Sequence, residues 1–387
     1  MVVARTLVPA LIGSWGQRLR PLRRSTAEHG FARLADSVRR RPWTTAGLTL
    51  VALLVVAAPA LGTHLIELGT NSLPATSQAR HAQSVLDAHF GLGTATVDVV
   101  APEGPATTSA HSLARVVEGV PGVKSVTMSP LGSQTLVVAN VIGDSDGPEA
   151  LRVVDEVRAL RLSHPVLVGG EAAFQLDHQR ALGERLPLAL LLLGGATMIL
   201  IGLLTRSLAL ALLAPLLAAV SEAAMLGALA WGYQQGHLQG ALPMSSTGSL
   251  IVYVPIVGVA IAYALSLDYL VFLLARVQEA RRAGHDLDHA MTEALSKTGP
   301  VITTAAGLMM LVFVAFATGS LLLIQQLGFA VASAVVIDAT LVRCLLLPAI
   351  VFLIGRRIHQ SIDVTRDRAE VAQLVPLVIE PTPSAVR

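Results

Sequence analysis

The chain alternates long apolar runs with one long mixed stretch. Six runs approach or exceed the roughly 20 helical residues that cross the hydrocarbon core of a bilayer. They are residues 43–62, 186–204, 208–232, 250–275, 301–318 and 327–354. Between the first two runs, residues 63–185 mix polar and apolar positions and contain no such stretch. This pattern predicts a multi-pass α-helical membrane protein of about six transmembrane helices, with a folded domain between the first two and the other five within residues 186–355.

The mixed stretch carries its own secondary-structure signals. Helical periodicity covers residues 77–90, 109–118 and 148–160, and short β-type runs cover 95–100, 123–128, 135–142 and 166–168. Glycine-containing turn signals fall between these elements, for example at Gly122 and residues 169–170. From residue 95 onward the order is β-α-β-β-α-β, the split βαβ plan of a ferredoxin-like sheet. We therefore expect an α+β domain here.

Basic residues indicate on which side of the bilayer each segment lies. Residues 17–41, directly before the first run, hold eight arginines against two acids. Arg206 follows the second run, and more basic residues lie between the fourth and fifth runs and after the sixth. By the positive-inside rule these segments are cytoplasmic, so residues 63–185 are external. The layout predicts a basic cytoplasmic segment over residues 1–42 and a flexible cytoplasmic tail over 356–387.

Composition excludes several classes of protein. Of the 387 residues, 53% are hydrophobic and 14% are charged, against about 25% charged in a soluble domain. The net charge is only +2, and no basic stripe for nucleic acid is present. The single cysteine, Cys344, excludes an intrachain disulfide and a cysteine-based metal site. Without a Walker, GxSxG or HExxH pattern, the sequence predicts neither an enzyme nor a cofactor.

A short internal repeat relates the two ends of the chain. Residues 3–18, VARTLVPALIGSWGQR, parallel residues 342–357, VRCLLLPAIVFLIGRR, which lie 339 positions later. Each copy passes from an apolar run through Pro-Ala to a glycine and a basic exit, as a last membrane helix does at the cytoplasmic face. The repeat predicts that residues 1–16 are the inner end of a helix from a preceding half of roughly 340 residues. A coincidental amphipathic segment is the alternative.

Asp268 and Tyr269 are adjacent within the fourth apolar run. A carboxylate in a membrane helix is costly unless it faces a partner or water, which indicates a function. Tyr269 alone would be uninformative, and its adjacency to the acid is what makes the pair a candidate functional site. In the alternative, Asp268 is a helix-end residue that reaches the cytoplasmic interface near Arg276.

Two other acids lie in predicted membrane helices. Asp338 precedes Arg343 by five residues, and the two are either relay members or a structural ion pair. Glu222 is either a substrate-path residue or a group hydrogen-bonded to a neighbour. His285 and His289 have an i, i+4 spacing that suits a metal ion. They lie in the basic cytoplasmic loop, where a solvated amphipathic helix explains them, so no metal site is predicted.

Several strings resemble those of a known family. They are SLDYLVFLLAR at 266–276, TGPVITTAA at 298–306, VIDATLVR at 336–343, LLPA at 346–349, RRPW at 40–43 and AAPALG at 57–62. Together they are similar to the MMPL family of the resistance-nodulation-division superfamily, whose members export lipids across the bacterial inner membrane. The resemblance implies two homologous six-helix halves, each with a porter-like external domain and an Asp-Tyr pair that relays protons.

The chain resembles the C-terminal half of a full-length member. Asp268 and Tyr269 match the second-half pair, Glu222 matches no relay position, and the first-half pair has no counterpart here. The resemblance implies proton-motive-force-driven export of a lipid or other hydrophobic substrate from a multi-pass inner-membrane protein. It implies a complementary half-transporter chain or a second copy as partner, besides membrane lipids and protons. A non-transporting membrane interaction or sensing module and an inactive truncated product are the alternatives.

Overall fold

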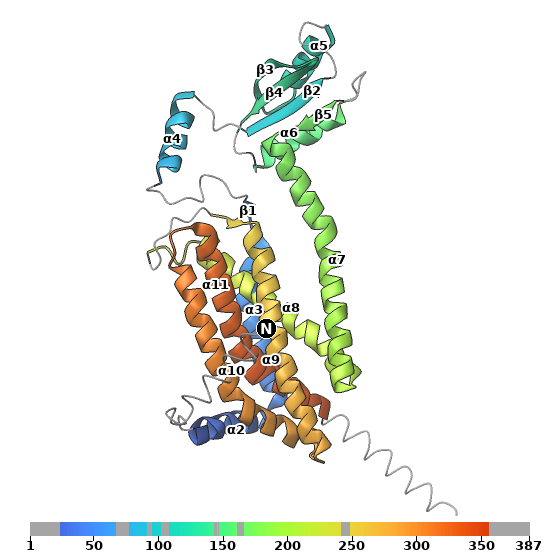
Figure 1. Cartoon of the computed structure of the whole chain (residues 1–387), viewed down its shortest axis with the longest axis vertical. Helices are drawn as coiled ribbons and strands as arrows, with labels where there is room; N and C mark the ends of the chain where they lie inside the picture. The colour runs from blue at the N-terminus through green and yellow to red at the C-terminus, as the bar shows by residue number, and fades with distance from the viewer. Residues whose placement is uncertain are drawn as a thin grey trace, which may run out of the picture.

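The computed structural model describes residues 24–66, 77–90, 95–101, 108–142, 145, 147–160, 166–240 and 248–355. A bundle of long helices lies below a smaller α+β unit (Figure 1). The predicted helix remnant at residues 1–16 and the predicted tail at 356–387 lie outside the described residues.

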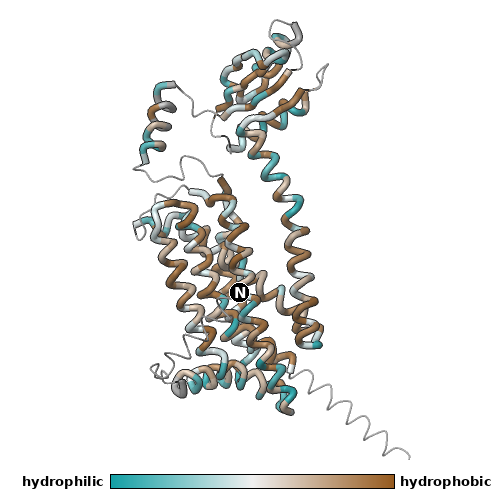
Figure 2. Tube along the Cα trace, in the orientation of Figure 1, coloured by the Kyte–Doolittle hydropathy of each residue, from teal (hydrophilic) through white to brown (hydrophobic). Residues whose placement is uncertain are grey.

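Within the described residues, six helices are long and apolar enough to cross a membrane, as predicted. They are α3 (Pro42–Ala57) with η1 (Ala58–Gly62), α7 (Glu171–Thr205), α8 (Leu208–Leu229) with η3 (Ala230–Gln234), α9 (Tyr253–Arg282), α10 (Leu287–Ala317), and α11 (Leu322–Ile337), which continues through η4 (Asp338–Leu346) to residue 355. Their exposed faces are rich in leucine and valine, and hydrophobic residues run along the length of the bundle (Figure 2). Such surfaces suit contact with lipid.

The α+β unit has the predicted split βαβ order. Its elements are β2 (Ala95–Ala101), α5 (Thr108–Glu118), β3 (Val123–Leu131), β4 (Gln134–Val141), α6 (Pro148–Ala159) and β5 (Leu167–Gly169), preceded by α4 (Gln78–Phe90). The strands pair antiparallel in the order β3-β4-β2-β5. Along β2 every second residue is buried, because one face packs against α5, α6 and the start of α7. The side of the membrane on which this unit lies stays a prediction.

Helix α7 is longer than the sequence predicts. The apolar run begins at residue 186, but the helix begins at Glu171 and continues unbroken for 35 residues. It passes from the α+β unit to the base of the bundle (Figure 1). Its first part has an apolar face in the core of the α+β unit, formed by Ala172, Ala173 and Leu176. The charged positions of that part concealed its continuity with the apolar run.

A long-range contact that the sequence did not predict connects the first and fourth spanning helices. β1 (Leu65–Ile66) pairs in parallel with β6 (Leu250–Ile251). Beside it, the side chain of Gln234 donates to the carbonyl of Gly62 at 2.6 Å and accepts from the amide of His64 at 2.9 Å. Two-residue strands have no period to detect, so only the folded chain shows this connection.

Helix α2 (Arg24–Arg40) lies across the base of the bundle (Figure 1). The arginine-rich pattern of this segment predicted only a basic cytoplasmic stretch and no helix. The helix packs against α10, where a Cβ at Gly299 would lie 2.6 Å from the ring of Phe31. The absence of a side chain at Gly299 therefore lets the two helices meet.

Gly227 is the point of closest approach between α8 and α3. A Cβ there would overlap the carbonyl oxygen of Val56 and lie 2.6 Å from Cα of Ala57. Gly227→Ala must push the helices apart, and overpacking of this kind typically costs about 1–3 kcal/mol. We expect a lower thermal unfolding midpoint in detergent. The matched control is Gly195→Ala in α7, where a Cβ meets nothing within 4 Å; equal midpoints for the two variants would contradict this packing.

Candidate functional site

A buried ion pair lies inside the bundle, where α9 faces the last helix. Nε of Arg343 donates to Oδ2 of Asp338 at 2.5 Å, and Oγ of Ser266 donates to Oδ1 of the same carboxylate at 2.9 Å. The three residues are only 2%, 6% and 8% exposed, respectively. Both carboxylate oxygens therefore have a partner, as a buried charge requires.

The guanidinium of Arg343 makes further contacts with α9. Its Nη2 donates to the backbone carbonyl of Ser266 and, at 3.1 Å, to the hydroxyl of the same residue. Its Cζ lies 5.5 Å from the ring centroid of Tyr269, within cation–π range. Its Nη1 is buried and has no hydrogen-bond partner among the described residues. Both oxygens of the Asp338 carboxylate are therefore hydrogen-bonded, whereas Nη1 of Arg343 donates to no group in the described part of the chain.

The π-helical segment η4 explains how two residues five apart form this pair. In an α-helix, residues i and i+5 point about 140° apart. In a π-helix each turn closes at i+5, which brings such residues onto one face. Asp338 begins η4 and Arg343 is the fifth residue after it. No residue pattern distinguishes a π-turn from an α-turn within an apolar run. The sequence therefore predicted the Asp338–Arg343 ion pair only as one of two possibilities, beside a relay.

The two adjacent residues of the predicted Asp-Tyr relay lie in different surroundings: Tyr269 faces the bundle core and Asp268 faces outward. Tyr269 is half-buried and packs against the bundle core, with its ring near Arg343. Asp268 is exposed, and its carboxylate forms no hydrogen bond or ion pair within the described part of the chain. It belongs to a stripe of exposed residues along α9, with Val257, Ala260, Ala264 and Phe272. We call this surface the Asp268 face.

Glu222 of α8 lies apart from these contacts. It is 6% exposed, and its buried Oε2 has no hydrogen-bond partner among the described residues. The three acids therefore have different environments: Asp338 is paired, Glu222 is buried with an unsatisfied oxygen, and Asp268 faces outward.

Two further residues of the candidate sites, Ser266 and Glu293, were not predicted from the sequence. Ser266 stands in the string around Asp268, but a serine in a membrane helix is common, and its partner Asp338 is 72 residues away. Glu293 lies next to His285 and His289, for which no metal site was predicted. The i+4 spacing of Glu293 from His289 could have indicated that the two side chains lie on one face of a helix. The approach of His285 to Glu293 depends on the turn that precedes α10, which the sequence does not show.

Comparison with protein families matches residues 65–380 to the MMPL family. The chain belongs to this family. A membrane protein of Streptomyces coelicolor is 37% identical over 361 residues, which are 92% of this chain and 50% of that protein. The trehalose monomycolate exporter MmpL3 of Mycolicibacterium smegmatis is 29% identical over 352 residues, covering 86% of this chain and 35% of the relative.

The mycolic acid-containing lipids exporter MmpL11 of the same species is 29% identical over 376 residues, 90% of this chain and 39% of the relative. The chain therefore spans between about a third and a half of these curated MMPL relatives, which fits the predicted resemblance to one half of a member. Among solved structures, a crystal structure of SecDF has a TM-score of 0.43 and 14% identity, covering 84% of this chain and 39% of that one. A TM-score of this size gives no basis for inferring function.

Breaking the buried pair should destabilise the MMPL bundle. Removing one partner of a buried ion pair leaves an uncompensated charge, which costs about 3–5 kcal/mol. We expect Arg343→Met and Asp338→Leu each to lower the thermal midpoint and the amount of protein in membranes. The double variant removes both charges of the pair and should recover most of the loss.

Asp268→Asn is the matched control, because that carboxylate is exposed and unpaired among the described residues. It should keep the wild-type midpoint. A double variant as unstable as either single variant would show that the ion pair is not the source of the loss.

Proposed function

We propose that this MMPL chain is half of a proton-driven transporter for a lipid or another hydrophobic substrate, completed by a second six-helix unit on the Asp268 face. Family membership supports transport as the activity, and relatives named as exporters of trehalose monomycolate and mycolic acid-containing lipids support the substrate class. The observation that carries the proposal is the exposed carboxylate of Asp268 on an apolar helix face.

The position of Asp268 makes its exposure costly in a bilayer. Arg276, the next charged residue along α9, is eight residues on, or about 12 Å along the helix axis. No charged residue precedes Asp268 in the helix. A lipid-facing carboxylate at such a site is disfavoured, and an aspartate side chain is too short to cover that distance by snorkelling. A second unit that covers the face with polar groups or water removes this cost.

Proton binding at Asp268 is the coupling step in this proposal. Uptake of a proton converts the carboxylate to a neutral acid, and release on the other side restores the charge. Tyr269 contacts the guanidinium of Arg343, so the charge at position 268 acts next to the Asp338–Arg343 pair. The two charge states of Asp268 favour different arrangements of α9 against the last helix, which is what coupling requires.

Helix α7 supports a mechanical connection to the α+β unit. One helix of 35 residues, about 50 Å long, has its first residues in the core of that unit and its last turns, around Thr197 and Ile201, packed against the bundle. The helix is continuous on both sides of Pro187, the position at which it can bend, and so connects the two units. We propose that the α+β unit is external and porter-like, and that it handles the substrate as the bundle responds to protons.

The topology follows from this proposal and is directly testable. In a Cys344→Ser background, a membrane-impermeant maleimide added to intact cells should label Ser145→Cys and should not label Ser361→Cys. Permeabilised cells provide the control, since both positions should then react. The reverse labelling pattern would contradict an external α+β unit with a cytoplasmic C-terminus.

Asp268→Asn should abolish proton-coupled transport while leaving folding intact, because it keeps the shape of the side chain but cannot exchange the proton. Tyr269→Phe should lower the rate less severely by removing one hydroxyl near the proton path. The measurement is substrate and proton flux in proteoliposomes that contain the chain with its complementary half, or the chain alone at high density. Asp36→Asn on α2, an exposed acid outside the bundle, is the control.

Full proton-coupled flux with Asp268→Asn would contradict the relay. The alternative, in which Asp268 is a helix-end residue that reaches the cytoplasmic interface, would then replace it. If the wild-type chain shows no flux, both with its complementary half and alone at high density, the result would favour a non-transporting module or an inactive product.

A further inference from the structure

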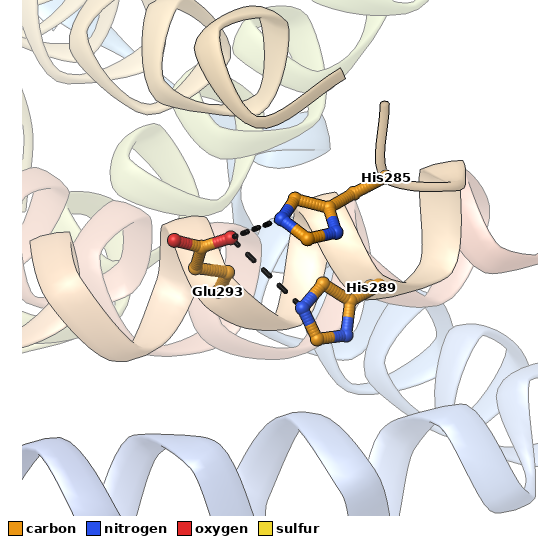
Figure 3. A group of neighbouring side chains, drawn as sticks. All are labelled: His285, His289 and Glu293. Carbon is orange, nitrogen blue, oxygen red and sulfur yellow. Dashed lines mark ion pairs between the residues drawn. The ribbon is translucent and has the colours of Figure 1, made fainter. Parts of the chain in front are cut away.

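The connection between α9 and α10 brings two imidazoles and a carboxylate together (Figure 3). His285 precedes α10, and His289 and Glu293 lie on its first two turns. Nε2 of His285 is 3.9 Å from Oε2 of Glu293, and Nε2 of His289 is 4.0 Å from the same oxygen. One ligand atom from each residue lies within 4.8 Å of the other two.

We propose that His285, His289 and Glu293 bind a divalent transition-metal ion of the Zn²⁺ class. Two imidazole nitrogens and one carboxylate oxygen suit Zn²⁺, Co²⁺ or Ni²⁺ better than Mg²⁺ or Ca²⁺, which prefer oxygen ligands. Tetrahedral bonds of 2.0–2.1 Å place ligand atoms about 3.3 Å apart. The two nitrogen–oxygen distances must therefore shorten by about 0.6–0.7 Å, and the nitrogen–nitrogen distance, at most 4.8 Å, by no more than about 1.5 Å. Exposed side chains reach such distances by rotation about their side-chain bonds.

The surroundings orient Glu293 for this role. Lys297 holds Oε1 of Glu293 at 2.5 Å, which leaves Oε2 directed to the histidines. An outer partner that fixes a ligating carboxylate is a usual part of metal sites. Asp286 accepts a hydrogen bond from the amide of His289 at 3.0 Å and so fixes the start of α10, from which His289 projects.

Charge and space also permit an ion. The neighbouring charged side chains cancel: Arg276 pairs with Glu279 at 2.7 Å, and Lys297 pairs with Glu293. A cavity of about 150 Å³ adjoins the group and is lined by His285, Glu293 and these charged residues. It has room for a water molecule as the fourth ligand.

Binding at this site joins the turn after α9 to the second turn of α10, so the ion restrains the connection between two spanning helices. This inference is independent of the proposed transport activity, because binding is measured without flux.

The test uses the full chain purified in detergent with a histidine-free affinity tag and treated with a chelator. Titration with Co²⁺, read by visible absorption, and with Zn²⁺, read by calorimetry, should show one saturable site per chain. His289→Ala and Glu293→Gln should each weaken binding by at least about tenfold. Zn²⁺ should raise the thermal midpoint of the wild type and leave that of His289→Ala unchanged.

The double variant His81→Ala/His89→Ala is the matched control, since both histidines lie on α4, far from this group (Figure 1). It should bind Zn²⁺ as the wild type does. The proposal is overturned if the wild type shows no saturable site, or if the ligand variants bind as tightly as the wild type.

Discussion

A carboxylate in hydrocarbon has neither water nor counter-charge, and this constraint shapes the bundle. Asp338 meets it internally: a π-turn places Arg343 on the same face, Ser266 caps the second oxygen, and the pair is enclosed between α9 and the last helix. Asp268 has no such arrangement within the described chain. Helix α9 therefore carries Ser266, which binds Asp338 and faces inward, and Asp268, which faces outward. In the proposed function a second six-helix unit covers Asp268.

The arrangement of the other elements is consistent with a unit that works with a partner. Close helix contacts at Gly227 and Gly299 fix the positions of α3, α8, α2 and α10. The β1–β6 pair holds the end of the first spanning helix next to the start of the fourth. Among the described residues, α7 is the helix that runs from the bundle to the α+β unit. In the proposed function, a change at the Asp268 face reaches the α+β unit along this helix.

The sequence predicted the features that depend on local pattern. Apolar length located the six spans, and the alternation of strand and helix periods predicted the split βαβ order. It did not predict features that depend on residues far apart. The β1–β6 pair, the Ser266–Asp338 bond and the convergence of His285 with Glu293 all need the folded chain. The start of α7 was missed because a helix that serves two environments changes its apolar pattern part-way. For Asp268, the sequence identified the acid and the structure added its outward direction.

Cysteine cross-linking in native membranes tests most directly whether a second six-helix unit covers the Asp268 face. In a Cys344→Ser background, Ala264→Cys lies on that face, one helical turn from Asp268, and Leu311→Cys lies on an equally apolar exposed position of α10. We predict that Ala264→Cys cross-links to a second copy or to a complementary MMPL half, identified by mass spectrometry, and that Leu311→Cys does not. If instead both cysteines stay uncross-linked and react equally with a maleimide dissolved in the lipid phase, lipid covers the face and the account is wrong.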